Sequence, residues 1–136
     1  MACKLLFTLV CDDARIEQSG KILVVGLYNY LIGFRPASPG PAGQNVLGLS
    51  QLCLVRRWLA LDTSPLAVET HIIDKRNGRT VLKTESNLAP PAAGAYSYEI
   101  LALRGVTLSE GIYSIETRLQ TGEVVGSPED ILVKAV

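Results

Sequence analysis

The stretch that decides the fold is residues 5–32, LLFTLVCDDARIEQSGKILVVGLYNYLI. The strand at its start, Lys4–Cys11, begins one residue earlier and alternates in the manner of a half-buried strand. The second part of the stretch, Ile22–Ile32, is almost continuously apolar, which is typical of a strand covered on both faces. Between them Ser19-Gly20 supplies a turn, because glycine accepts positive φ. The stretch therefore predicts a β-hairpin whose connection is Asp12–Gly20.

Gly26 interrupts the second apolar run. A glycine inside a strand marks a bulge or a point where another group comes close to the backbone. We therefore expect one of these two features at Gly26.

The rest of the chain repeats short apolar runs separated by turn residues. Asn77-Gly78 is a strong hairpin signal because both residues tolerate positive φ, so it joins strands over Leu66–Asp74 and Thr80–Glu85. No segment carries a clear helical stripe, although Val46–Leu52 is compatible with a short helical turn. Further strands are expected over Leu52–Leu61, Tyr96–Leu103, Ile112–Leu119 and Ile131–Val136.

This pattern predicts an all-β protein, with residues 1–136 forming a single antiparallel β-sandwich domain of about seven to nine strands, immunoglobulin-like in arrangement. Apolar residues make up 48% of the chain and charged residues 19%, which suits a folded core. The Pro-rich segments at 35–45 and 86–95 are too short to be linkers between domains.

The balance of charges limits the classes of partner that the chain is expected to bind. Thirteen Lys and Arg residues equal thirteen Asp and Glu residues, so the chain lacks the basic surplus of proteins that bind nucleic acid or anionic membranes. No segment approaches the roughly 20 apolar residues of a membrane-spanning helix. Little repulsion opposes contact between copies. The expected partner is therefore the protein itself or another protein.

The cysteines indicate the compartment. Three cysteines, Cys3, Cys11 and Cys53, form no disulfide framework. Cys3 and Cys11 are eight residues apart, so on one strand they share a face but lie too far apart to bridge. We expect all three to be reduced and mostly buried, which favours a cytoplasmic location.

The first candidate motif is Asp12, Asp13, Arg15 and Glu17. Paired carboxylates can bind a hard cation, but the ordered oxygen ligands of a calcium loop do not follow them. Neighbouring side chains on a strand also point to opposite faces. The favoured interpretation is turn architecture, in which Asp12 and Asp13 accept loop N–H groups or pair with Arg15. A role in ligand or partner recognition at this loop stays open.

The second candidate set is aromatic. Four residues are candidates for a pocket or an interface: Tyr30, Trp58, Tyr96 and Tyr98. Of these, Tyr96 and Tyr98 are expected on one face of a strand. Arg56-Arg57 precedes Trp58, and the two arginines should point to opposite faces. For Trp58 itself we favour a packed position beside a rim arginine. Tyr113 resembles the strand-entry tyrosine of sandwiches, whose hydroxyl binds the preceding backbone.

No motif points to catalysis. His71 is the only histidine, and no nucleophile elbow, zinc-binding or phosphate-loop pattern accompanies it. The sequence therefore predicts a protein that is not an enzyme, with no cofactor and no metal.

The opening stretch resembles the N-terminal signature of a family of small bacterial proteins of unknown function. The matching pattern is C-D-D-x-R-x-E, then Gly-Lys, then V-G-x-Y, carried here by Cys11, Asp12, Asp13, Arg15, Glu17, Gly20, Lys21, Gly26 and Tyr28. The resemblance implies a compact β-sandwich and no particular activity.

Two functions follow as hypotheses. The first is a non-catalytic protein-interaction or assembly module that self-associates into a homo-oligomer through a sandwich edge, with Ile131–Val136 as the exchanged edge strand. The alternative is a small-molecule-binding domain, or an enzyme with an unrecognised site, in which the loops at 35–45 and 86–95 frame a pocket.

Overall fold

The computed structural model describes residues 3–35 and 45–136, which form β-strands and no helix. The strands are β1 (Cys3–Ile16), β2 (Ile22–Tyr28), β3 (Leu31–Phe34), β4 (Val46–Ala60), β5 (Leu66–Asp74), β6 (Arg79–Leu88), β7 (Tyr96–Ser109), β8 (Gly111–Leu119) and β9 (Val124–Ala135). The predicted all-β class and strand number are confirmed.

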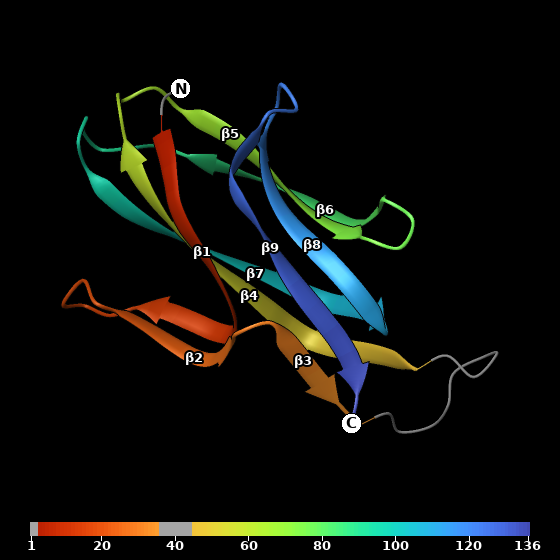
Figure 1. Cartoon of the computed structure of the whole chain (residues 1–136). Coiled ribbons are helices and arrows are strands. Elements are labelled where there is room, and N and C mark those ends of the chain that lie inside the picture. Colours follow the sequence, from red (N-terminus) through yellow and green to blue (C-terminus); the bar gives the residue numbers. More distant parts are fainter. Residues whose placement is uncertain (1–2, 36–44) are drawn as a thin grey trace.

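The strands form two sheets packed face to face. Sheet A has the order β2-β1-β4-β7, and sheet B has the order β3-β9-β8-β5-β6. Neighbouring strands are antiparallel except β3 and β9, which are parallel. Figure 1 shows β8 and β9 of sheet B lying over β4 and β7 of sheet A, with β1 beside β9. The predicted antiparallel β-sandwich is therefore confirmed.

The core lies between the two sheets and follows the period-2 alternation of the strands. Leu52 and Leu54 of β4 meet Ile72 of β5 and Ile115 of β8 in one buried cluster. The intervening residue Cys53 points to the opposite, outer face of sheet A, where it belongs to a separate cluster. Sheet A is thus apolar on both faces near the middle of β4.

A β-bulge in β1 changes which side chains face the core. The register with β4 shifts between Leu5 and Phe7. Cys3 therefore packs inside the sandwich near Trp58, whereas Cys11 lies on the outer face of sheet A. The prediction that Cys3 and Cys11 share a face is wrong, because one extra residue exchanges the two faces of a strand.

The N-terminal hairpin is longer and differently placed than the sequence suggests. β1 continues to Ile16, and the turn occupies residues 17–21, closed by the Glu17 N–H to the Lys21 carbonyl at 2.8 Å. The prediction of a connection over Asp12–Gly20 is therefore wrong. The predicted strand Ile22–Ile32 is two strands, because β2 joins sheet A and β3 joins sheet B.

Two further expectations are wrong. The C-terminal strand is not an edge, since β9 lies between β3 and β8 and pairs with both. Residues Val46–Leu52 form no helical turn and belong to β4, where they pair with β7 over Leu103–Ser109. The Asn77-Gly78 hairpin is confirmed, with Asp74 paired to Arg79 across the turn.

A charged pair lies inside the sandwich, which the sequence did not suggest. Arg56 is fully buried, and its Nε donates to Glu99 Oε1 at 2.7 Å. Arg56 Nη1 also donates to Thr70 at 2.8 Å and Thr117 at 2.9 Å on the facing sheet. Trp58 Nε1 donates to the same Glu99 oxygen at 3.2 Å. Hydrogen bonds thus join sheets A and B through this pair.

Candidate functional site

β2 is an edge of sheet A. Within the described residues it pairs with β1 and with no second strand. Its seven residues, ILVVGLY, include no charged side chain. Val25 is 51% exposed and Leu27 is 57% exposed. One side of the sheet therefore ends in an apolar strand with an unpaired backbone edge.

One face of the hairpin formed by β1 and β2 packs against buried residues of β4. Ala14 of β1 and the side chains of Ile22 and Val24 of β2 pack against the buried cluster of Cys53 and Val55. Through these side chains the far end of the hairpin formed by β1 and β2 packs against the outer face of β4 in the same sheet. This packing holds the β2 edge in a fixed position relative to the sandwich.

Asp12 ties β2 to β1. The Tyr28 hydroxyl donates a hydrogen bond to Asp12 Oδ1. Burial, with help from this hydrogen bond to the carboxylate, raises the pKa of Tyr28 to about 12. The expected close approach at Gly26 is confirmed, because a Cβ there would lie 2.1 Å from Asp12 Oδ2. Only glycine leaves room for this carboxylate.

The Asp13 side chain forms its hydrogen bonds on the opposite side of β1. Its Oδ1 accepts the Ala14 N–H at 3.0 Å and Gln51 Nε2 at 3.0 Å. Arg15 and Glu17 are exposed, and their side chains make no hydrogen bond or ion pair within residues 3–35 and 45–136. The structure therefore does not bring the four residues of this motif together.

An aromatic patch lies on the outer face of sheet A near the opposite end of β1. We define it as Phe7, Arg57, Tyr96 and Tyr98. The Arg57 guanidinium lies 5.0 Å from the ring centre of Tyr96 and 4.8 Å from that of Tyr98, and Nη1 donates to the Tyr98 hydroxyl at 2.6 Å. Phe7 and Tyr98 have ring centres 6.4 Å apart. Tyr96 is 59% exposed, so the aromatic patch is open to contact.

Trp58 does not belong to any open surface. It is fully buried inside the sandwich, so the favoured packed position is confirmed and its candidacy for a pocket or interface is wrong. As expected, Arg56 and Arg57 point to opposite faces, because β4 alternates. Arg57 is the rim arginine, and Arg56 is the buried one that the sequence did not single out.

Tyr30 lines a groove between β1, the segment after β2, and β9. The groove has a volume of about 350 Å³, and its walls include Phe7, Tyr28 and Tyr30. Glu129 and Asp130 lie at its other side, and Asp130 pairs with Lys75 at 2.9 Å. This groove combines aromatic walls with acidic side chains.

A second hollow of about 260 Å³ lies by the predicted 86–95 loop. Asn87, Leu88 and Pro90 line it together with Tyr98 and Glu99. The other predicted loop, 35–45, falls mostly outside the described residues, since the structure does not describe positions 36–44.

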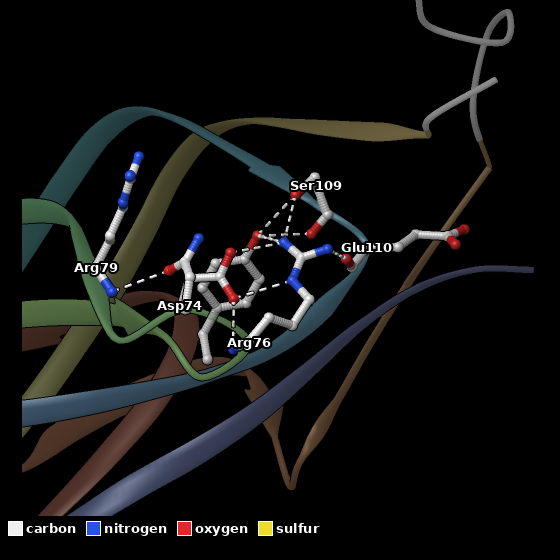
Figure 2. Close-up of polar contacts among 7 residues, drawn as sticks. Asp74, Arg76, Arg79, Ser109 and Glu110 are labelled. Carbon is white, nitrogen blue, oxygen red and sulfur yellow. Dashed lines mark hydrogen bonds and ion pairs between the residues drawn. The ribbon is translucent and has the colours of Figure 1, made fainter. Parts of the chain in front are cut away.

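Arg76 builds a polar corner that the sequence did not reveal (Figure 2). Its Nε and Nη2 donate to the two oxygens of Asp74 at 3.0 and 2.7 Å. Its Nη1 donates to the Glu110 carbonyl at 2.7 Å, so the turn after β5 is joined to the turn before β8. The Arg76 hydrogen bonds hold the pKa of Asp74 below its usual range.

Tyr113 completes this corner. Its hydroxyl donates to the Ser109 carbonyl at 2.8 Å, four residues earlier in the chain. The structure thus gives Tyr113 the predicted structural role at the entry of β8. Every donor nitrogen of the Arg76 guanidinium is engaged in this corner, so we assign it to the architecture of the sandwich.

Searches against protein-family models and against curated proteins find no match to this chain. In the part of the chain that the structure describes, no three His, Cys, Asp or Glu side chains gather as metal ligands. Within the same residues, no helix is long and apolar enough to cross a membrane.

Proposed function

We propose that this protein is a non-catalytic, self-associating interaction module, in which the β2 edge of one copy pairs with the β2 edge of a second copy. The observation that carries the proposal is the β2 edge itself, an uncharged strand with exposed Val25 and Leu27. Unpaired N–H and C=O groups along such a strand are a template for another strand.

The chemistry of β2 suits a two-fold contact. In a two-fold dimer the β2 strands of the two copies pair antiparallel, so the same β2 residues of each copy form the contact. A charged residue near the centre of this contact would lie close to its own copy in the partner, and β2 contains no charged residue. The balanced charge of the whole chain also opposes association little.

The opposite edges of the two sheets carry features that oppose strand pairing. β6, at the edge of sheet B, holds Arg79, Lys83 and Glu85. β7, at the other edge of sheet A, directs Glu99 into the sandwich and carries the exposed Arg104. β3, the other edge of sheet B, is uncharged but only four residues long (Leu31–Phe34). Charged residues and very short strands are usual protections of sheet edges. β2 has neither, and this contrast selects β2 as the edge that associates.

The experiment compares a lysine on β2 with a lysine on β6. Val25→Lys places a charge at the proposed contact, and Val81→Lys places the same charge on the β6 edge. The two valines are matched, since they are 51% and 47% exposed. Sedimentation velocity is measured in reducing buffer at two protein concentrations for the wild type and both variants.

We expect the wild type and Val81→Lys to sediment as dimers and Val25→Lys as a monomer. Circular dichroism and thermal unfolding check that both variants keep the wild-type fold. A monomeric wild type at both concentrations, or a dimeric Val25→Lys, would contradict the proposal.

A second candidate function rests on the groove between β1 and β9. Its volume of about 350 Å³ falls in the range of small-molecule sites, and Phe7 and Tyr30 give it aromatic walls. Glu129 and Asp130 line it, and because Asp130 is already paired with Lys75, Glu129 is the carboxylate that would receive a small amine. Amines that bind should raise the melting temperature of the wild type but not of Glu129→Gln. A flat response to amines, metal ions and nucleotides would exclude this function.

We further propose the immunoglobulin-like classification. The order β1-β4-β7 follows strands A, B and E of such domains, and β6-β5-β8-β9 follows C′, C, F and G. The Tyr113 bond to the Ser109 carbonyl supports this, since it has the form of the tyrosine corner before strand F.

The resemblance to the bacterial family and the cytoplasmic location remain predictions. The second is supported by three free, buried cysteines, a state that a reducing compartment maintains.

A further inference from the structure

Two of the three cysteines lie directly opposite each other. Cys11 of β1 and Cys53 of β4 are partners in the antiparallel register of sheet A. Directly opposed residues on such strands have Cα atoms about 4.5–5.5 Å apart, which falls within the span that a disulfide bridges. Both side chains are fully buried and free. The backbone thus already holds two thiols at bridging distance.

The two thiols differ in their surroundings. The Cys11 thiol donates to the Cys53 carbonyl at 3.6 Å, and burial raises the pKa of Cys11 to about 12. Burial also raises the pKa of Cys53, but hydrogen bonds from the Cys11 thiol and the Ala14 N–H act in the opposite direction. Cys53 is therefore the better placed of the two to become a thiolate.

The hairpin of β1 and β2 covers this pair. Ala14, Ile22 and Val24 pack against the cluster that contains both cysteines. Because Cys11 lies on β1 itself, we expect an external reagent to reach the sulfur atoms when the end of the hairpin beyond Cys11, which carries these three side chains, opens. The closed hairpin therefore protects the dithiol, and local opening controls its reactivity.

We propose that Cys11 and Cys53 form a covalent-modification site, a dithiol that closes to an intramolecular disulfide on exposure to a low-molecular-weight disulfide such as oxidised glutathione. Cys3 takes no part, because the bulge between Leu5 and Phe7 places it on the other side of sheet A.

The reaction proceeds by two exchanges. With this end of the hairpin open, the Cys53 thiolate attacks one sulfur of oxidised glutathione, and the other glutathione leaves as a thiolate that takes up the proton released by Cys53. Cys11 then loses its proton and attacks the Cys53 sulfur of this mixed disulfide, which releases the second glutathione thiol. The protein is oxidised by two electrons, and one glutathione disulfide is reduced to two thiols.

The test uses the full chain carrying Cys3→Ser, so that the pair holds the only thiols. Reduced protein is incubated with oxidised glutathione in native buffer and in urea below the unfolding midpoint. Acid quenching, alkylation in denaturant and intact-mass analysis then count the thiols.

We expect the protein to lose the mass of two hydrogen atoms and to take up no alkylating agent, faster in urea than in native buffer. The closed loop should raise the melting temperature by up to about 10 °C, reversed by dithiothreitol. Cys11→Ser in the same background should stop at a glutathione adduct on Cys53. Stable glutathione adducts in Cys3→Ser, disulfide-linked dimers, or two free thiols under both conditions would overturn the proposal.

Discussion

The buried ion pair between Arg56 and Glu99 should contribute far more to stability than a similar pair on the surface. The perturbation is Glu99→Gln, which keeps the size of the side chain and removes its charge. The Glu99 carboxylate accepts hydrogen bonds from Arg56, from Trp58 and from Ser86 at 2.7, 3.2 and 2.5 Å. An amide has one oxygen, and its NH₂ group cannot accept from these donors.

The magnitude follows from what Arg56 loses. A hydrogen bond to a charged group contributes about 1.5–3 kcal/mol. The guanidinium is also left as an uncompensated charge with no exposed surface, which brings the cost of breaking a buried pair to about 3–5 kcal/mol. Thr70 and Thr117 still accept from Arg56, so we expect the lower half of this range.

The assay is urea unfolding at pH 7, with Glu116→Gln as the control. Glu116 pairs with Arg118 at 2.7 Å on the outer face of sheet B, where the side chains are 19% and 30% exposed. A partly solvated pair of this kind contributes about 0–1 kcal/mol. If Glu99→Gln lowers the free energy of unfolding by less than about 1 kcal/mol, or no more than Glu116→Gln, the reasoning about the buried charge is refuted.

Two further predictions concern Asp74 and Gly26. Arg76 holds the pKa of Asp74 below 3.8, so the stability from this carboxylate is present above about pH 4 and lost as the pH falls through the folded pKa. Asp74→Asn should therefore reduce the loss of stability between pH 5 and pH 2, measured as the change of the urea unfolding midpoint with pH. The same loss in the variant and the wild type would contradict this. Gly26→Ala should cost at least about 1 kcal/mol more than Gly20→Ala, because both have positive φ but only Gly26 faces Asp12. Equal unfolding midpoints of the two variants would disprove it.

The candidate site was only partly foreseeable. Exposed Tyr96 could be proposed from the sequence, because alternation along β7 places it beside Tyr98 on one face. The exposed edge formed by β2 could not, since a continuous apolar run is equally typical of a strand covered on both faces. Arg56 shows the same limit. The sequence favours a packed Trp58 beside a rim arginine, but which of the two arginines is buried depends on the facing sheet.

The motif of Asp12 and Asp13 illustrates a second limit. Alternation correctly separates the two carboxylates onto opposite faces. Their partners Tyr28 and Gln51 come from two different strands, and no local pattern indicates which strands neighbour β1. The polar corner of Arg76 was missed for the same reason, because its acceptors come from β5 and from the turn before β8.

The all-β class and the Asn77-Gly78 hairpin were determined by the sequence itself. Period-2 alternation and turn chemistry act over a few residues, so they can be read without knowing the fold. Only the tertiary structure decided which strands form edges and which face of β1 is buried on each side of its bulge. It also decided that Cys11 lies opposite Cys53. These properties depend on contacts between segments far apart in the chain, and one inserted residue in a strand is enough to exchange its two faces.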